Sequence, residues 1–145
     1  MALIELVYRS RTEIEWTHSS LSELLAHSRE NNLVAGVSGV LLYRPGEFLQ
    51  VLEGEEAGVI SLFQHISQDP RHFDIETLRM GQIDDRNFPK WSMGFDAPVT
   101  AKQSQPELDK LVLDGGLCDK RFAALRAKFC SVTYELLKQF INREL

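Results

Sequence analysis

Hydrophobic and polar residues alternate at the start of the chain, over residues 3–10. Ile4, Leu6 and Tyr8 fall on one face of this segment when it is extended, and Val7 falls on the other. A period of two residues is typical of a β-strand. The pattern therefore predicts a first strand with the Tyr8 ring on its inner face.

Apolar residues then recur at helical spacing over residues 19–32, which predicts an α-helix. Ser20, followed by Glu23 three residues later, is a capping-box signature for the start of this helix. Asparagine tolerates the left-handed conformation that often follows a helix, so we expect the helix to end at Asn31–Asn32.

Two β-rich runs, residues 36–43 and 47–53, flank the dipeptide Pro45–Gly46. Proline fixes φ at the first central position of a type II turn, and glycine accepts the positive φ of the second. The pattern therefore predicts a β-hairpin. Its second run carries Gln50 among apolar residues, and a buried amide without partners costs about 1–3 kcal/mol.

A second helix is predicted over residues 55–69, with Glu55 and Glu56 placed favourably at the positive end of the helix dipole. Its apolar stripe consists of Val59, Leu62, Phe63 and Ile66. A fourth strand is predicted over residues 75–84. A fifth is predicted over residues 91–96, with Trp91, Met93 and Phe95 on one face.

The order β-α-β-β-α-β-β predicts an α+β fold of the ferredoxin-like type. In such a fold a mostly antiparallel sheet carries two helices on one face. The expected division of the chain is a domain over residues 1–97 and a helical extension over residues 98–145, both within one compact unit.

The extension is predicted to contain a connector over residues 97–105, a short helix within residues 105–116 and a longer helix from about residue 119. The longer helix carries an apolar stripe with steps of three and four residues. The stripe consists of Phe122, Leu125, Phe129, Val132, Leu136 and Phe140. We expect this extension to cover the second face of the sheet or to bind another protein.

The totals exclude several classes of protein. The chain has 145 residues, of which 43% are hydrophobic and 26% are charged, as in an ordinary soluble domain. A net charge of −5 argues against a nucleic-acid or anionic-membrane surface. No apolar run approaches the ~20 residues of a membrane span, and the first ten residues lack the features of a signal peptide. We therefore expect a cytoplasmic protein.

Cysteine and histidine give no sign of a metal site. Cys118 and Cys130 form neither a metal-binding spacing nor a disulfide framework, and we expect reduced thiols on a helix. The four histidines are scattered along the chain. A glycine-rich phosphate loop of the G-x-x-x-x-G-K type does not occur.

Several polar and aromatic residues each allow a structural and a functional interpretation. Gln50 is either satisfied by the core or solvent, or held against a polar ligand or another side chain. The hydroxyl of a buried Tyr8 needs a partner, by default a backbone carbonyl or water. Asn32 taken alone is a helix cap. Trp91 and Met93 taken alone are core residues.

A basic pair, Arg71 and His72, is typical of a solvated loop but also suits a phosphate contact. Taken singly, each of these residues favours the structural interpretation. Their combination and their spacing along the chain change that weighing.

In combination the chain resembles the BLUF family, blue-light sensors that use FAD, over residues 3–96. The pieces that carry the resemblance are "LVYRS", "SRENNLVAGVSGVLLY", "FLQVLEG", "QDPRH" and "FPKWSM". Each piece is weak alone, but all of them in order at the family's spacing are highly specific.

The resemblance implies a role for each matching residue. Tyr8 matches the photoactive tyrosine, and Gln50 matches the glutamine between that tyrosine and the N5/O4 edge of the flavin. Trp91 and Met93 match a fifth-strand pair, one of which approaches the glutamine amide. Ser38 stands where many members carry threonine, a conservative departure.

The resemblance also implies a set of flavin contacts. Asn32 matches the asparagine that hydrogen-bonds the flavin ring, and Asn31 matches a neighbouring position that lines it. Arg71 and His72 match the basic pair after the second helix, with His72 the weaker candidate for a direct contact. Family members hold the ring between the two helices predicted here.

The family's mechanism implies that light drives an electron and a proton from Tyr8, and that the return of both leaves the Gln50 amide rearranged by rotation or tautomerisation. An amide with one acceptor oxygen and two donor hydrogens allows more than one arrangement. The expected result is a red-shifted flavin spectrum. We expect the signal to pass through the fifth strand and the C-terminal helices.

About fifty residues follow the predicted fifth strand, too few for a cyclase or phosphodiesterase domain. We therefore expect a sensor that is not itself an enzyme and that acts on a separate effector protein or through a changed homo-oligomer. Two alternatives remain: a small enzyme of acylphosphatase-like topology, and a cofactor-free dimeric binding module. Bound yellow flavin distinguishes the sensor from both.

Overall fold

The computed structural model of the chain describes residues 2–89, 91–97 and 131–142. Its strands and helices are β1 (Leu3–Arg11), α1 (His18–Ala35), β2 (Ser38–Arg44), β3 (Glu47–Glu55), α2 (Glu56–Ser67), β4 (Phe73–Ile83), β5 (Gly94–Asp96) and α5 (Ser131–Asn142). The described strands form one sheet in the order β4-β1-β3-β2-β5. The β2–β5 pair is parallel and the other pairs are antiparallel. The predicted α+β, ferredoxin-like architecture is confirmed.

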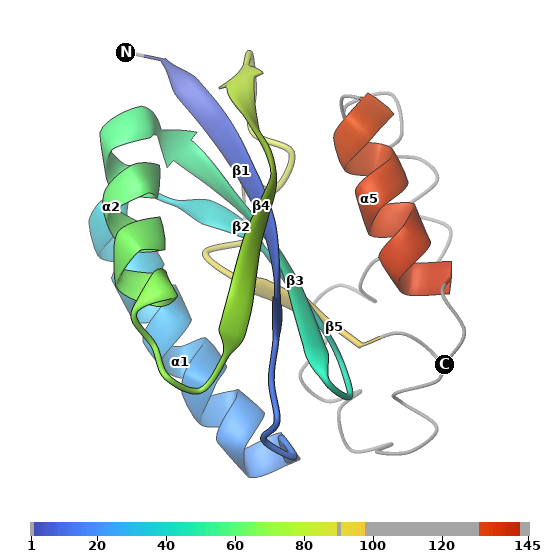
Figure 1. Ribbon diagram of the computed structural model, residues 1–145. Coiled ribbons are helices and arrows are strands. Elements are labelled where there is room, and N and C mark those ends of the chain that lie inside the picture. The colour runs from blue at the N-terminus through green and yellow to red at the C-terminus, as the bar shows by residue number, and fades with distance from the viewer. Residues whose placement is uncertain (1, 90, 98–130, 143–145) are drawn as a thin grey trace.

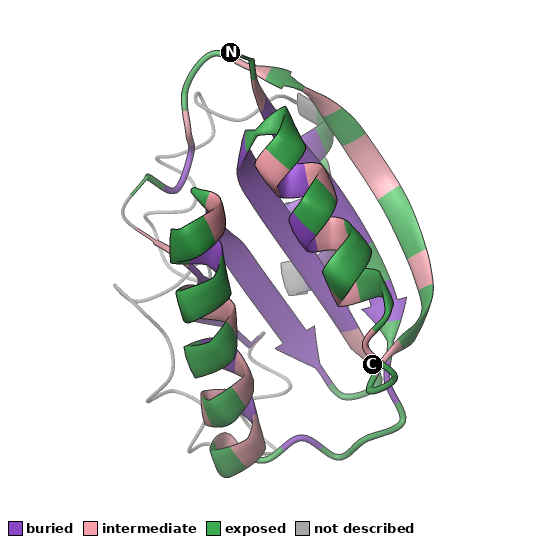
Figure 2. Cartoon of the chain, turned by 90° about the vertical axis from the view of Figure 1, so that its left-hand side faces the viewer, coloured by how far each residue is buried: buried purple, intermediate pink, exposed green. Residues whose placement is uncertain are grey.

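The sheet lies between two layers of helix, because α1 and α2 cover one face and α5 packs on the other (Figure 1). The larger core cluster fills the space under α1 and α2, and includes Leu21 and Leu25 of α1 and Val59 and Leu62 of α2. A smaller cluster joins α5 to the opposite face. β2 and β3 are therefore buried almost throughout, while the outward sides of both helices are exposed (Figure 2).

The α1 helix begins and ends at other residues than the sequence predicts. Thr17 is the N-cap, and it exchanges hydrogen bonds with Ser20 in a capping box. The predicted box at Ser20 and Glu23 is therefore wrong by one turn, because a serine takes the reciprocal role that glutamate usually has. The helix continues past Asn31–Asn32 to Gly36, which adopts φ 70° at no steric cost.

The hairpin of β2 and β3 is confirmed, with Gly46 at φ 90° in its turn. At the other end of β2, Gly39 allows the two backbones to approach closely. A Cβ atom at this position would lie 1.9 Å from the carbonyl oxygen of Val51. No larger residue fits there without moving the strands.

The fifth strand is shorter than predicted. Only residues 94–96 pair with β2, and residues 91–93 form a bent segment before it. The prediction that Trp91, Met93 and Phe95 share one face is wrong for Trp91. Met93 and Phe95 belong to the cluster under α1 and α2, whereas Trp91 packs with the cluster on the α5 face. The period of two residues fails because the backbone is not extended there.

The α5 helix covers the second face of the sheet, one of the two places that the sequence suggests for the extension. Its predicted stripe is partly wrong. Val132 belongs to the stripe but is 50% exposed, whereas Leu137 was not predicted and is fully buried beside Phe140. The residues of that stripe before 131, the short helix within 105–116 and most of the connector lie outside the described residues. The boundary between residues 97 and 98 stays a prediction.

Buried polar groups also join α5 to the sheet. The hydroxyl of Thr133 donates to Oε1 of the buried Glu5 at 2.6 Å, and Arg79 donates to the same oxygen at 2.8 Å. Arg44 is fully buried on β2 and donates to the Phe140 carbonyl at 3.3 Å. These contacts fix the position of α5 more narrowly than apolar packing alone. Among the described residues no helix has both the length and the apolarity needed to cross a membrane.

The packing of α5 can be tested with a pair of alanine variants. Leu137→Ala is expected to lower the free energy of unfolding by about 2–5 kcal/mol, because it leaves a cavity in a closed cluster. Val132→Ala, on the half-exposed side of the same helix, is expected to change it by less than about 0.5 kcal/mol. Urea unfolding followed by circular dichroism measures both. Equal losses would contradict this packing.

Candidate functional site

A cavity of about 430 Å³ lies between α1, α2 and the sheet face that they cover. Its volume is in the range of small-molecule sites. Its walls combine apolar side chains with amide, imidazole, hydroxyl and charged groups. They are Tyr8, Trp16, Leu24, His27, Ser28, Asn31, Leu41, Phe48, Gln50, His65, Ile66, Gln68, Asp69, Arg71 and His72.

Tyr8 and Gln50 form the floor of this cavity. The antiparallel register of β1 and β3 places the two residues directly opposite each other, so their side chains project from the same face. The Tyr8 hydroxyl donates a hydrogen bond to Oε1 of Gln50. Both side chains are almost completely buried. The apolar strand therefore tolerates Gln50 because its neighbouring strand supplies a donor.

The other end of the Gln50 amide faces Met93. Nε2 of Gln50 donates to Sδ of Met93 at 3.4 Å, and a thioether is a weak acceptor. The amide oxygen thus points to Tyr8 and the amide nitrogen to Met93. Among the described residues, the second N–H of this amide has no protein acceptor.

The surroundings of Tyr8 keep its phenol protonated. Burial raises the pKa of Tyr8 above its usual value, and the negative charge of Asp69 raises it further. The ring packs against Phe63 at a centroid distance of 5.3 Å and against His72 at 6.3 Å. Tyr8 is therefore a neutral hydrogen-bond donor at neutral pH.

The His72 ring is held by two fixed partners. Its Nε2 lies 2.8 Å from the carbonyl oxygen of Ile66, which can only accept, so Nε2 carries a proton. Its Nδ1 lies 2.7 Å from the Ser10 hydroxyl, which donates to it when the ring is neutral. Because both ring nitrogens already have protein partners, His72 contributes to the cavity as a wall and not as a hydrogen-bonding group.

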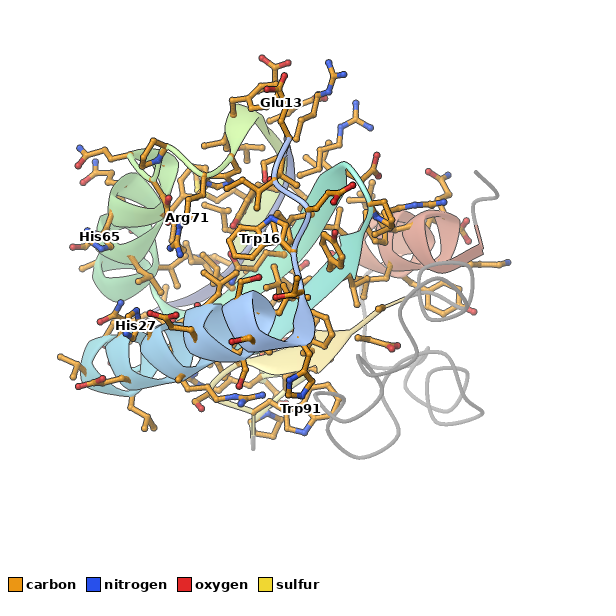
Figure 3. The ribbon with its side chains drawn as sticks, turned by 90° about the horizontal axis from the view of Figure 1, so that it is seen from below. Glu13, Trp16, His27, His65, Arg71 and Trp91 are labelled. Carbon is orange, nitrogen blue, oxygen red and sulfur yellow. The ribbon has the colours of Figure 1, made fainter. Side chains whose placement is uncertain are left out.

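Arg71 lies at the edge of the cavity beside Trp16 (Figure 3). Its guanidinium forms a bidentate pair with Asp69, with the shortest contact at 2.6 Å, and its Cζ atom lies 5.6 Å from the Trp16 ring centroid. The Arg71 hydrogen bonds lower the pKa of Asp69, and those of Asp69 raise the pKa of Arg71. The charge of Arg71 is therefore largely balanced by its neighbour.

The two adjacent asparagines of α1 have different surroundings. Asn31 is exposed and lines the cavity, while Asn32 is only 1% exposed and donates to the carbonyl of Ser92 at 2.5 Å. Trp91 does not line the cavity. It stacks on Phe88 at a centroid distance of 5.6 Å and lies beside β5 (Figure 3).

The structure thus brings together five of the sequence-predicted residues around one cavity: Tyr8, Asn31, Gln50, Arg71 and His72. Met93 reaches this group through Gln50, and Asn32 contacts the segment that carries Met93. Trp91 lies apart from it.

Sequence reasoning missed several wall residues. Leu24, His27 and Ser28 lie on the same face of α1 as the predicted Asn31, and their spacing of three and four residues from it and from one another was a signal that could have identified them. Trp16 had no such signal, because it lies in the loop before α1 and reaches the cavity only through the fold.

A buried carboxylate on β3 anchors the loop that leads to Met93. Glu53 accepts from the backbone N–H groups of Asn87 at 2.9 Å and Phe88 at 2.5 Å, and from the Ser38 hydroxyl at 3.2 Å. Burial raises the pKa of Glu53 above its usual value. These hydrogen bonds and the nearby charge of Arg86 oppose the rise but do not cancel it. The loop before β5 is therefore fixed to the centre of the sheet.

Comparison with known proteins gives consistent matches for this arrangement. A family model described as "BLUF: Sensors of blue-light using FAD" matches residues 3–94. Photoactivated adenylate cyclase subunit beta of Euglena longa is 34% identical over 92 residues, which are 63% of this chain and 11% of that subunit. The chain therefore spans about a tenth of the length of this curated relative.

Two solved structures extend the likeness to most of the chain. The dark-state structure of BlrB, a BLUF protein, has a TM-score of 0.66 and 30% identity, and the match covers 93% of this chain and 97% of BlrB. Klebsiella pneumoniae BlrP1 with FMN and cyclic diGMP has a TM-score of 0.67 and 27% identity. That match covers 96% of this chain and 34% of BlrP1.

The protonation of Tyr8 gives a test in the alkaline range. A folded-state pKa raised above about 10 means that Tyr8 contributes stability that is complete below pH 10 and is lost as the pH rises further. The free energy of unfolding of the wild type should therefore fall more steeply between about pH 9.5 and 11 than that of Tyr8→Phe. Denaturant titrations at several pH values measure this, and equal slopes would contradict the buried environment of Tyr8.

Proposed function

This chain belongs to the BLUF family, whose members sense blue light using FAD, and we propose that it is itself a photoreceptor that binds FAD non-covalently. The observation that carries the proposal is the hydrogen bond from Tyr8 to Gln50 on the floor of a cavity of suitable size. A buried phenol with a fixed acceptor can release an electron together with its proton, and a buried amide, with one acceptor oxygen and two donor hydrogens, can adopt more than one hydrogen-bond arrangement.

The cavity residues suit a flat ring with polar edges. Leu24, Leu41 and Ile66 provide apolar walls for the faces of such a ring. On the floor, the second amide N–H of Gln50 lacks a protein acceptor among the described residues, and a ring nitrogen or carbonyl would supply one. The chemistry of the walls therefore fits the cofactor of the family.

We assign cofactor binding to the residues that the resemblance indicates. Gln50 and Asn31 line the cavity and would bind the ring edge. Asn32 is assigned from the resemblance alone, because it is buried outside the cavity lining and its nitrogen holds Ser92. Tyr8 and His72 would close the floor and one wall. Arg71, at the edge of the cavity, would lie beside the part of the cofactor outside the ring.

When bound, FAD supplies blue-light absorption and an excited ring that is a strong oxidant toward a nearby phenol. Tyr8 holds its proton on the hydrogen bond to Gln50, so Oη is the atom where the proton leaves and returns. The return of the proton can leave Gln50 in a new hydrogen-bond arrangement, because its amide can rotate or tautomerise without moving the strand.

Rotation of the Gln50 amide would change its relation to Met93. The amide oxygen would then face Sδ of Met93, and a thioether has no hydrogen to donate. Met93 would therefore have to move, or the oxygen would stay unpaired on that side. This is a physical reason for Met93 to relay the switch.

A displacement at Met93 has a short path to the other face of the sheet. Trp91, two residues earlier, packs in the same cluster as Leu137 and Phe140 of α5. Met93 therefore faces the cavity side and Trp91 the α5 side of one bent segment. We propose that Trp91 acts here as part of the output path, and that residues 98–145 carry the signal onward.

We further propose that the signal reaches a separate effector protein or changes a homo-oligomer. The likeness to BlrB, a BLUF protein, covers 97% of that chain. Light-dependent elution on size-exclusion chromatography would detect a changed oligomer. An acylphosphatase-like enzyme or a cofactor-free module would purify without pigment.

The switch assignment predicts the behaviour of Gln50→Leu. The purified wild type is expected to be yellow and to show a red-shifted flavin band after blue light. Gln50→Leu is expected to keep flavin but lose the red shift, because leucine neither donates nor accepts a hydrogen bond. Absorption spectra before and after illumination measure this. A normal red shift in Gln50→Leu would refute the assignment.

A second variant tests the donor. Tyr8→Phe retains the ring packing but lacks the hydroxyl, so it is expected to bind flavin and to lose at least about nine-tenths of the red shift. The matched variant Tyr134→Phe, on α5, is expected to retain the full response. A preserved response in Tyr8→Phe would mean that another residue donates the electron.

A further inference from the structure

Two side chains of α1 bind consecutive backbone carbonyls in the bent segment before β5. Nε of Arg29 donates to the Met93 carbonyl at 2.9 Å, and Nδ2 of Asn32 donates to the Ser92 carbonyl at 2.5 Å. The two residues are three positions apart and therefore lie on one face of the helix. Together they attach residues 92 and 93 to α1.

This attachment explains why β5 begins only at Gly94. Successive carbonyls of an extended strand point to opposite sides, so one helix cannot bind two in a row along a regular strand. Because Arg29 and Asn32 bind both carbonyls, residues 92 and 93 depart from the strand conformation. The same bend separates Met93, in the cluster under α1, from Trp91 in the cluster under α5.

Arg29 acts on the residue that contacts the switch. Its carbonyl partner belongs to Met93, whose side chain is fully buried and accepts from Nε2 of Gln50. Asn32 holds Ser92, and among the described residues the hydrogen bonds of the Gln50 side chain go to Tyr8 and Met93 and not to Ser92. The chain of contacts from α1 to the amide therefore runs through Arg29.

The position of Arg29 is costly for a surface helix. Burial lowers the pKa of Arg29, and its Nη2 atom is buried without a partner among the described residues. An arginine placed only for solubility would turn its guanidinium toward water. The Arg29 guanidinium instead turns toward the bent segment, where its Nε bonds the Met93 carbonyl.

We propose that Arg29 is a positioning residue for the light response, because its bond to the Met93 carbonyl keeps Met93 Sδ in place as the acceptor for Gln50. This inference rests on the proposed function of Gln50 as the switch. It concerns the dark orientation of the amide, with its nitrogen directed to Met93. Arg29 itself contacts neither the cavity nor Gln50 among the described contacts.

The first experiment uses the protein without flavin. The chain has three methionines, of which Met93 is fully buried and Met80 is 54% exposed. Methyl NMR of methionine-labelled protein with a soluble paramagnetic agent is expected to show Met93 protected in the wild type. In Arg29→Ala, the broadening of the Met93 methyl signal is expected to rise about threefold or more, because the segment loses a charged hydrogen-bond donor.

Arg9→Ala is the matched control, because it removes the same charge from a half-exposed ion pair with Glu76 on the sheet. Its Met93 signal is expected to match the wild type, and Met80 serves as the exposed reference in every sample. If Arg29→Ala does not fold, Arg29→Gln replaces it, since glutamine keeps most of the side-chain volume. An unchanged Met93 signal in the folded Arg29 variant would overturn the proposal.

The second experiment uses the flavin-bound protein and a double-mutant cycle. Arg29→Ala is expected to shift the dark flavin band and to change the rate of dark recovery about tenfold, the effect of one lost charged hydrogen bond. In a Met93→Leu background, the same substitution is expected to change both by less than about twofold. Equal effects in the two backgrounds would show a general structural role and overturn the inference.

The two experiments separate this inference from the proposed function. If the wild-type protein binds no flavin or shows no red shift, the proposed function is refuted. The methyl experiment would still report whether Arg29 holds Met93. If the wild type responds normally to light and Arg29→Ala leaves the Met93 signal unchanged, only the inference about Arg29 is refuted.

Discussion

The register of β1 against β3 is the constraint on which the site depends. It places Tyr8 directly opposite Gln50 in the middle of the sheet, where the phenol satisfies a buried amide. A shift of one residue would turn Gln50 to the α5 face and leave an amide among apolar residues. The alternation of side chains toward two separate cores fixes this register, because both strands are buried on both faces.

A second constraint acts on the segment between β4 and β5. Glu53 holds its first part by backbone N–H groups, and Arg29 and Asn32 hold its last part by backbone carbonyls. Charged and polar groups are used here because a loop has backbone donors and acceptors that no strand satisfies. The result is a bent segment with Met93 on one side of the sheet and Trp91 on the other.

The two faces of the sheet have different chemistry. The face under α1 and α2 holds the cavity and the Tyr8–Gln50 pair. The face under α5 holds an apolar cluster together with the buried Glu5 and Arg44, which bind Thr133 and Phe140 of the helix. Buried polar contacts of this kind are specific in geometry, so a small displacement of the sheet changes how well α5 fits.

The sequence by itself determined the first four strands, both helices between them and the hairpin turn, because two- and three-to-four-residue periods and a Pro-Gly pair are local signals. It also indicated Tyr8 and Gln50 as buried polar residues that need partners, whereas their assignment to a flavin site rests on the resemblance of the chain to a family. Only the tertiary structure decided the short β5, the separation of Trp91 from Met93 and the buried face of α5. Those features depend on contacts between residues far apart in the chain, such as Arg29 with Met93 and Glu53 with Phe88, and no local pattern encodes such contacts.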